Sequence, residues 1–294
     1  MAEPQGPGRR TVAFVLGGGG HLGANEVGML HALLERGISP DLIVGTSVGA
    51  LNGVAVAADP SLESVGKLRE AWLALGKDRV FASPFGGAAN LARKGTHLHS
   101  NRNLRGLIER LLPVERFEEL KVPFQCVAAS VERAAEHWFA EGPIVPAILA
   151  SAAVPGLLPP VEIDGEHYLD GGLVNSIPIE RAIQLGANEL YILQVGRIEQ
   201  PLSPPRNLIQ VATVAFEIAR RHRFARDMAS LPEGAVGHVL PTGEEGPPTG
   251  LNQLKYRDFT HVAQRIESAH RASSLYLDAL AQSSTGTGMT QEPA

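Results

Sequence analysis

A serine in a glycine-flanked turn is the residue of this chain best placed to act as a nucleophile. The stretch Gly45–Gly49 reads G-x-S-x-G, with an apolar run at 42–44 before it and a helix-forming run at 50–58 after it. In a strand–turn–helix context this motif is a nucleophile elbow, which exposes the serine oxygen. The positive end of the following helix points at that oxygen. The spacing therefore predicts Ser47 as the nucleophile, with Gly45 and Gly49 as the elbow glycines.

An acid beside a second glycine turn is the best candidate for the base. Asp170 precedes Gly171 and Gly172 and ends a run, 161–169, that alternates around a turn as a β-hairpin does. A carboxylate could accept the serine proton directly and return it to the leaving alcohol. An ordinary aspartate, with a pKa of about 3.9, is a weak base, so burial would have to raise its pKa. We expect a Ser47–Asp170 dyad only if the two turns touch.

A serine–acid–histidine triad is the alternative. Four late histidines could complete it, namely His222, His238, His261 and His270. None lies in a glycine turn at the end of a predicted strand, so each is expected to have a surface or structural role. Variants of Asp170 and of these histidines would separate the dyad from the triad.

A glycine loop supplies candidate donors for an oxyanion. Gly17–Gly23 follows the apolar run 12–16 and leads into a helical pattern. Such a loop presents free N–H groups to an anion, and each donor is worth about 3 kcal/mol in comparable sites. We expect the N–H groups of Gly18, Gly19 and Gly20 to form an oxyanion hole. A phosphate-binding P-loop is excluded, because no Gly-Lys-Ser/Thr follows the glycines.

The same glycines also match a dinucleotide fingerprint. Gly18, Gly20 and Gly23 have the spacing G-x-G-x-x-G, and Asp41 lies about 20 residues further on. The fingerprint places its acid at the end of the second strand, but Asp41 precedes the run 42–44, and residues 45–47 occupy the required end. Dinucleotide binding is therefore the less favoured alternative.

The composition limits the remaining classes of function. The chain has 294 residues, 44% of them hydrophobic, and a net charge of −5, which predicts a globular core and no nucleic-acid partner. Its one cysteine, Cys126, lies in an apolar run and is expected in the core. There is no apolar run of about 18 residues and no apolar signal core at the N-terminus, so a cytoplasmic protein is expected. His97 and His99 are the only close pair of metal-ligand types, without an acidic or cysteine partner nearby, and neither metal nor cofactor is expected.

Strands and helices alternate from 11 to 195, which predicts an α/β fold with a mainly parallel central sheet. Active sites in such sheets gather at the carboxyl ends of strands, where the glycine loop, Ser47 and Asp170 are all expected. We expect a disordered tail at 1–9, a catalytic domain at 10–200, a mostly helical extension at 201–281 packed on the same domain, and a disordered tail at 282–294. Residues 81–95 could be a lid or acyl-chain wall, or an ordinary surface loop.

The expected helix from 204 to about 228 ends in a group of basic residues, Arg220, Arg221, Arg223 and Arg226. Cations are favourable at the C-terminal end of a helix, which would explain them. The alternative is a basic patch that faces a membrane surface.

Four blocks together resemble the patatin-like phospholipase family, of the bacterial acyl-hydrolase type. They are Gly17–Gly23, Gly45–Gly49, Ala150–Gly156 and Asp170–Gly172, in this order. The resemblance implies a three-layer α/β/α fold, a Ser47–Asp170 dyad, an oxyanion hole from the first loop, and hydrolysis of acyl esters, usually of lipids, without metal or cofactor. We expect a lipid or other acyl-ester substrate, and leave open whether the protein is cytosolic or lies peripherally at a membrane. The oligomeric state is left open.

The chain departs from the family pattern at one position. The family usually has Arg or Lys just before the last glycine of the first block, where this chain has Leu22, preceded by His21. The backbone N–H groups of the loop do not depend on this side chain, but affinity for a phosphate head group should be weaker. The departure motivates a further hypothesis, a lipid-binding or partner module with little catalysis.

Overall fold

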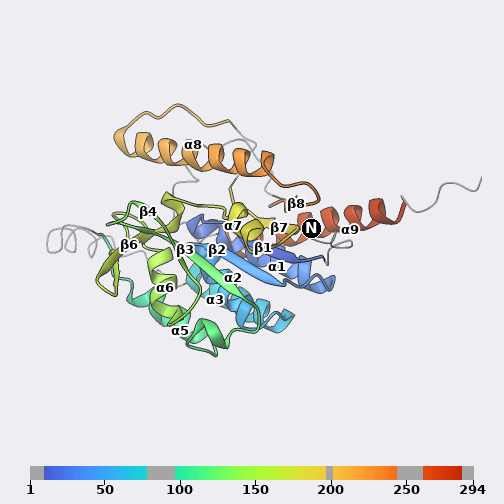
Figure 1. Cartoon of the computed structure of the whole chain (residues 1–294), viewed down its shortest axis with the longest axis horizontal. Coiled ribbons are helices and arrows are strands. Elements are labelled where there is room, and N and C mark those ends of the chain that lie inside the picture. The colour runs from blue at the N-terminus through green and yellow to red at the C-terminus, as the bar shows by residue number, and fades with distance from the viewer. Residues whose placement is uncertain (1–9, 78–96, 197–200, 244–260, 287–294) are drawn as a thin grey trace, which may run out of the picture.

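The computed structural model describes residues 10–77, 97–196, 201–243 and 261–286 (Figure 1). The tail expected at 1–9 and the lid or loop expected at 81–95 lie outside these residues. None of the described helices combines the length and the apolar character that crossing a membrane requires.

Five parallel strands form the centre of the molecule. They lie in the order β3 (Phe124–Ser130), β2 (Leu42–Thr46), β1 (Val12–Leu16), β7 (Glu189–Leu193) and β8 (Val236–Val239). Alternate residues of β1 enter different apolar clusters: Phe14 and Leu16 pack on one face of the sheet, and Ala13 and Val15 on the other. Both faces are therefore covered, as expected for parallel strands that are apolar along their whole length.

Helices cover both faces of the sheet and give the expected three-layer α/β/α fold. One layer contains α1 (Ala24–Glu35), α2 (Val48–Ala58), α3 (Leu62–Lys77), α5 (Arg102–Leu111), α6 (Ile144–Ser151) and α9 (Val262–Gly286). The other contains α7 (Ile179–Gln184) and α8 (Leu208–Ala229). In Figure 1, α8 lies on one side of the sheet and α3, α5 and α6 on the other. Cys126 is in the buried core, as its sequence context predicted.

The last described helix differs from the prediction at its end. Helix α9 continues to Gly286, so the prediction of a disordered tail from residue 282 is wrong for the first residues of that tail. It packs closely along α1, because a Cβ atom built on Gly28 would lie 2.2 Å from the carbonyl oxygen of Ile266. Ile266, Ala269 and Leu277 belong to the same apolar cluster as α1. Residues that follow the parallel sheet in sequence thus complete its core.

Three antiparallel strands complete the sheet, namely β4 (Ala135–Phe139), β5 (Val161–Ile163) and β6 (Glu166–Asp170). Strand β4 pairs with Cys126–Ser130 along one edge of β3. The other edge pairs with β2 up to Val127 and with β6 from Ala128 onward. Strands β2 and β6 therefore meet end to end on one edge of β3. Asp170 reaches the carboxyl edge of the parallel strands from the opposite direction, because β6 is antiparallel.

Candidate active site

Ser47 occupies a strained turn between β2 and α2. Its backbone has φ 55° and ψ −119°, a conformation that costs a residue with a side chain on the order of 1–3 kcal/mol. The glycines on each side allow this turn. A Cβ atom on Gly45 would lie 2.6 Å from the carbonyl oxygen of Gly49, and one on Gly49 would lie 2.5 Å from that of Leu16. The N–H of Ser47 donates to Ser151 Oγ at 2.9 Å, which holds the elbow against α6.

The Ser47 hydroxyl contacts the Asp170 carboxylate directly. Ser47 Oγ donates to Asp170 Oδ2 at 2.6 Å across 123 positions of sequence. The N–H of Gly172 donates to the other carboxylate oxygen at 2.7 Å and fixes its orientation. Ser47 is 6% exposed and Asp170 is 7% exposed. The structure thus brings together the two residues that the glycine turns singled out.

Burial changes the basicity of Asp170. Removal of the carboxylate from water raises the pKa of Asp170 to about 6, and the hydrogen bonds from Ser47 and Gly172 oppose this rise with smaller effects. At neutral pH the group is mostly ionised, yet its proton affinity is well above that of an exposed aspartate. This combination suits a general base, because a carboxylate with a higher pKa holds a transferred proton better.

The turn after Asp170 is covered closely. A Cβ atom on Gly171 would lie 2.2 Å from the carbonyl oxygen of Val127, so glycine lets the turn approach β3. A Cβ atom on Gly172 would lie 3.2 Å from Phe216 Cζ of α8. An aromatic ring from the second helical layer therefore lies beside the Asp170 turn.

The glycine loop lies against the elbow, but one of its expected donors is already used. The Gly18 N–H donates to the carbonyl oxygen of Ser176 at 2.8 Å. The prediction that Gly18 supplies an oxyanion donor is therefore corrected. In the described part of the chain, the N–H groups of Gly19 and Gly20 have no such backbone acceptor. Gly20 has φ 58°, and a Cβ atom on Gly18 would lie 3.5 Å from Ser47 Cβ, so the loop lies beside Ser47.

Leu22, which departs from the family pattern, and His21, which precedes it, are both buried. His21 and Leu22 point into the molecule rather than into solvent. His21 therefore does not present a substitute for the missing basic side chain on the surface of the loop.

Two of the late histidines are engaged far from Ser47. His238 contacts Glu189 at 3.5 Å, and Glu189 begins β7 at the amino edge of the sheet. His270 contacts Glu35 at 3.0 Å, at the end of α1. Within the described residues, the Ser47 hydroxyl is hydrogen-bonded to Asp170, and not to His222 or His261.

One surface group has the composition of a metal site. In the described part of the chain, potential ligand atoms of His31, Glu35 and His270 all lie within 4.8 Å of one another. Arg36 already pairs with Glu35 and also with Asp278 of α9. These contacts join α1 to α9 as ion pairs and hydrogen bonds, and we assign no metal to them. His97, from the pair noted in the sequence, is buried and its backbone pairs with Gly156.

The arginines at the end of α8 have acidic partners. Arg220 pairs with Glu217 at 2.9 Å, and Arg223 pairs with Glu136 at 2.8 Å. Arg221 also pairs with Glu217, and Arg226 pairs with Asp227. Because nearby acids compensate these charges, the interpretation as a basic membrane-facing patch loses its support.

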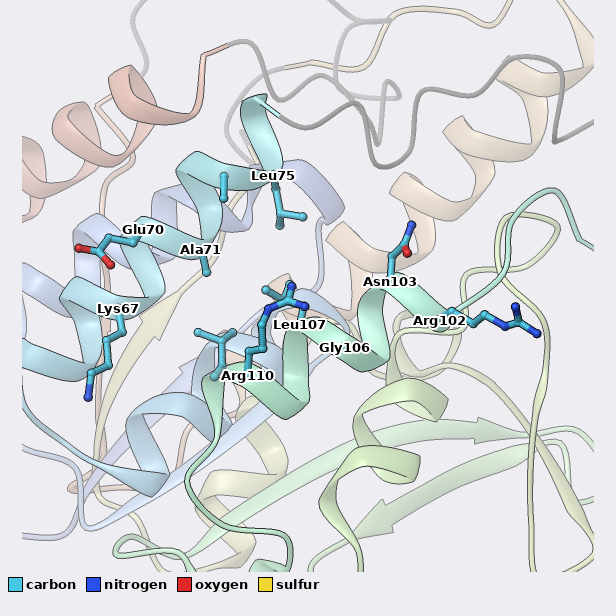
Figure 2. A pocket seen from close by; sticks show the side chains of 11 residues that line it. Lys67, Glu70, Ala71, Leu75, Arg102, Asn103, Gly106, Leu107 and Arg110 are labelled. Carbon is cyan, nitrogen blue, oxygen red and sulfur yellow. The ribbon is translucent and has the colours of Figure 1, made fainter.

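A groove of about 630 Å³ lies between α3 and α5 (Figure 2). Arg110 extends across it between the two helices, whereas Glu70 and Arg102 point away. Leu75 and Leu107 contribute to its apolar wall. None of its lining residues belongs to the Ser47–Asp170 contact, and we assign it no part in the chemistry.

The fold and this geometry define a class: three-layer α/β/α proteins with a serine elbow and a buried carboxylate at the carboxyl edge of the sheet. The family model described as "Patatin-like phospholipase" matches residues 14–183. The chain belongs to the patatin-like phospholipase family.

Several proteins of similar sequence are described as lysophospholipases or patatin-like phospholipase domain proteins, in agreement with this family. Lysophospholipase nte1 of Aspergillus terreus is 28% identical over 194 residues, which cover 65% of this chain and 12% of that protein. Patatin-like phospholipase domain-containing protein ZK370.4 of Caenorhabditis elegans is 33% identical over 203 residues, covering 65% and 14%. The human patatin-like phospholipase domain-containing protein 6 is 29% identical over 188 residues, covering 63% and 13%. The chain thus matches less than a fifth of the length of these relatives.

Among solved structures, VipD from Legionella pneumophila aligns with 89% of this chain and 67% of its own, at 14% identity and a TM-score of 0.42.

Sequence reasoning missed several residues that support the site. Ser151 Oγ accepts a hydrogen bond from the Ser47 N–H, and the carbonyl oxygen of Ser176 accepts one from the Gly18 N–H. Ser151 lies in the Ala150–Gly156 block, but nothing in its spacing indicates a contact with Ser47. Glu26 and Asn52, buried beneath the loop, look in sequence like ordinary helix residues.

Proposed function

We propose that this chain is a serine acyl-ester hydrolase for lipid or lysolipid esters, with Ser47 as nucleophile and Asp170 as base. The observation that carries the proposal is the 2.6 Å hydrogen bond from Ser47 Oγ to a buried carboxylate. Family membership supports a lipid acyl hydrolase, and the elbow geometry supports the choice of nucleophile.

The first half of the proposed reaction forms an acyl-enzyme. Ser47 Oγ attacks the ester carbonyl while Asp170 accepts the hydroxyl proton. The developing oxyanion accepts hydrogen bonds from the N–H groups of Gly19 and Gly20. Collapse of the tetrahedral intermediate breaks the ester C–O bond, and the leaving alcohol receives the proton from Asp170.

The second half releases the acid. Water attacks the acyl-enzyme carbonyl and gives a proton to Asp170. The second tetrahedral intermediate then collapses with cleavage of the bond between the acyl carbon and Ser47 Oγ, Asp170 returns the proton to Ser47 Oγ, and the carboxylic acid leaves. The sum is one ester and one water converted to one acid and one alcohol. Neither half requires a metal or cofactor.

The test is hydrolysis of p-nitrophenyl acyl esters and lysophospholipids by the wild type and by Ser47→Ala. We expect hydrolysis by the wild type and none above background by a folded Ser47→Ala. Wild-type activity that survives this substitution would overturn the proposal.

A second candidate is a lipid-binding or partner module with little catalysis, favoured by Leu22 and the burial of His21 at the glycine loop. Covalent labelling of Ser47 by a fluorophosphonate separates the two, because labelling requires an activated oxygen. Lipid binding without labelling would favour the module.

A further inference from the structure

A carboxylic side chain lies completely buried beneath the glycine loop. Glu26, in the first turn of α1, is 0% exposed. Asn52 of α2 donates from Nδ2 to Glu26 Oε2 at 2.7 Å and to the carbonyl oxygen of Gly23 at 2.9 Å. Trp72 of α3 donates from Nε1 to Asn52 Oδ1 at 2.9 Å. One network therefore joins three helices to the last residue of the glycine loop.

The network connects the two parts of the site. Gly23 closes the loop that carries Gly19 and Gly20, and Asn52 lies on the helix that begins directly after Ser47. The contact at this point is close, because a Cβ atom on Gly23 would lie 2.3 Å from Val48 Cγ2 and 3.0 Å from Trp72 Cζ2. A change in the network would therefore move the loop relative to the nucleophile.

The environment of Glu26 favours a neutral acid. Burial raises the pKa of Glu26 well above its usual value, and hydrogen bonds from Asn52 and the Gly17 backbone lower it by less. An unpaired charge at this depth would be costly, and a negative charge beneath the loop would also oppose a developing oxyanion. A neutral acid keeps the acceptor that Asn52 requires without that charge.

We propose that Glu26 is a positioning residue, which acts through Asn52 and Gly23 to hold the glycine loop at a fixed distance from Ser47. It makes no contact with the reacting atoms in this role. The inference rests on the proposed function, because the groups that it positions are the N–H donors of Gly19 and Gly20.

The main experiment compares Glu26→Ala with Glu26→Gln. The amide of Gln is neutral and keeps an acceptor for Asn52, so its kcat should stay within about threefold of the wild type. Alanine removes the acceptor, and its kcat should fall by on the order of tenfold or more while KM changes by less than about twofold, because misplaced donors act on the transition state. Hydrogen exchange should accelerate at residues 17–23 in Glu26→Ala and not in Glu26→Gln.

A milder pair of variants covers the case in which Glu26→Ala does not fold. Trp72→Phe removes the indole donor to Asn52 and keeps an aromatic ring, so we expect a loss of several-fold in kcat. The matched control is Trp138→Phe, since Trp138 donates to Glu136 outside the network and should leave kcat unchanged.

The outcomes separate the two proposals. A wild type without Ser47-dependent hydrolysis would overturn the proposed function and, with it, the positioning role of Glu26. An active wild type, together with a folded Glu26→Ala of unchanged kcat and unchanged exchange at 17–23, would overturn the inference about Glu26 alone. Equal effects of Trp72→Phe and Trp138→Phe would also overturn it.

Discussion

Thr46 and Asp170, the last residues of β2 and β6, pair with Val127 and Ala128, which are neighbours on β3. Two strands of opposite direction therefore end facing each other on one edge of a third strand. Ser47 follows Thr46 directly, so backbone pairing brings the hydroxyl to the carboxylate. The contact between Ser47 and Asp170 thus depends on sheet register more than on the flexibility of either side chain.

Replacement of Ser47 should separate activity from stability. We expect both Ser47→Ala and Ser47→Gly to lose at least about 10³-fold in kcat/KM, because each removes the nucleophile. Ser47→Gly should have a free energy of unfolding larger than that of Ser47→Ala by roughly 1 kcal/mol, and so a higher unfolding temperature, because glycine relieves the strain of the positive φ. Ester hydrolysis and thermal unfolding measure the two effects. Equal stability of the two variants would contradict the strain.

Replacement of Asp170 by Asn should lower kcat by about 10²- to 10⁴-fold, the range expected for loss of a general base. The amide still offers an oxygen to the Gly172 N–H, so the turn should persist. Hydrolysis and fluorophosphonate labelling of Ser47 should fall together. Activity that survives this substitution and disappears in a late-histidine variant would indicate a triad.

The pH dependence of activity should report the environment of Asp170. Because burial raises its pKa to about 6, kcat/KM should fall tenfold per pH unit below about pH 6 as the base becomes protonated. A pH–rate profile with a stable buffer series measures this limb. If kcat/KM instead began to fall only near pH 4, the Asp170 carboxylate would not be shielded from water in the free enzyme.

The burial of Asp170 should also make the stability of the protein depend on pH. Activity should rise with pH, whereas the free energy of unfolding should fall. The folded protein binds the Asp170 proton more tightly than the unfolded chain does. The free energy of unfolding should therefore fall as pH rises from about 4 to about 6, by up to about 3 kcal/mol from this group. At pH 7, Asp170→Asn should be more stable than the wild type by up to that amount. Denaturant titrations of both proteins at pH 4 and pH 7 isolate this contribution from that of Glu26.

Alanine substitutions in the glycine loop should distinguish donors from supports. A Cβ atom on Gly19 would lie 2.1 Å from Val195 Cγ2, so Gly19→Ala should displace the loop and lower kcat by about 10²-fold. The Gly18 N–H already binds Ser176, and a Cβ atom there would meet its nearest neighbours at 3.5 Å. Gly18→Ala should therefore lose less activity than Gly19→Ala. A larger loss of activity in Gly18→Ala than in Gly19→Ala would indicate that the Gly18 N–H does donate to the oxyanion.

Local patterns predicted much of the fold and drew attention to Ser47 and Asp170, the two residues that the fold brings into contact. The apolar runs that form β1 and β2 each end in a glycine turn, and these turns drew attention to the loop Gly17–Gly23 and to Ser47. Asp170 was found because its hairpin ends in two glycines. These signals depend on residues close in sequence, which is why they can be read without coordinates.

The remaining features depend on contacts between distant segments. The antiparallel direction of β6 follows from its pairing with β3, and the use of the Gly18 N–H follows from the position of Ser176. Glu26 resembles a solvated acid that favours a helix N-terminus, but the overlying helices bury it. No spacing rule indicates such an environment.

The close packing of α9 on α1 has a practical meaning for anyone who expresses part of this protein. The family match ends at residue 183, yet Ile266, Ala269 and Leu277 fill the apolar surface of the first helix. A gene fragment that ends at residue 183 would expose this apolar surface to solvent, so the fragment should aggregate. A fragment that ends after residue 286 keeps α9 and should purify as a folded monomer or defined oligomer. The end of the family match and the end of a gene fragment that folds should therefore differ by two strands, β7 and β8, and two helices, α8 and α9.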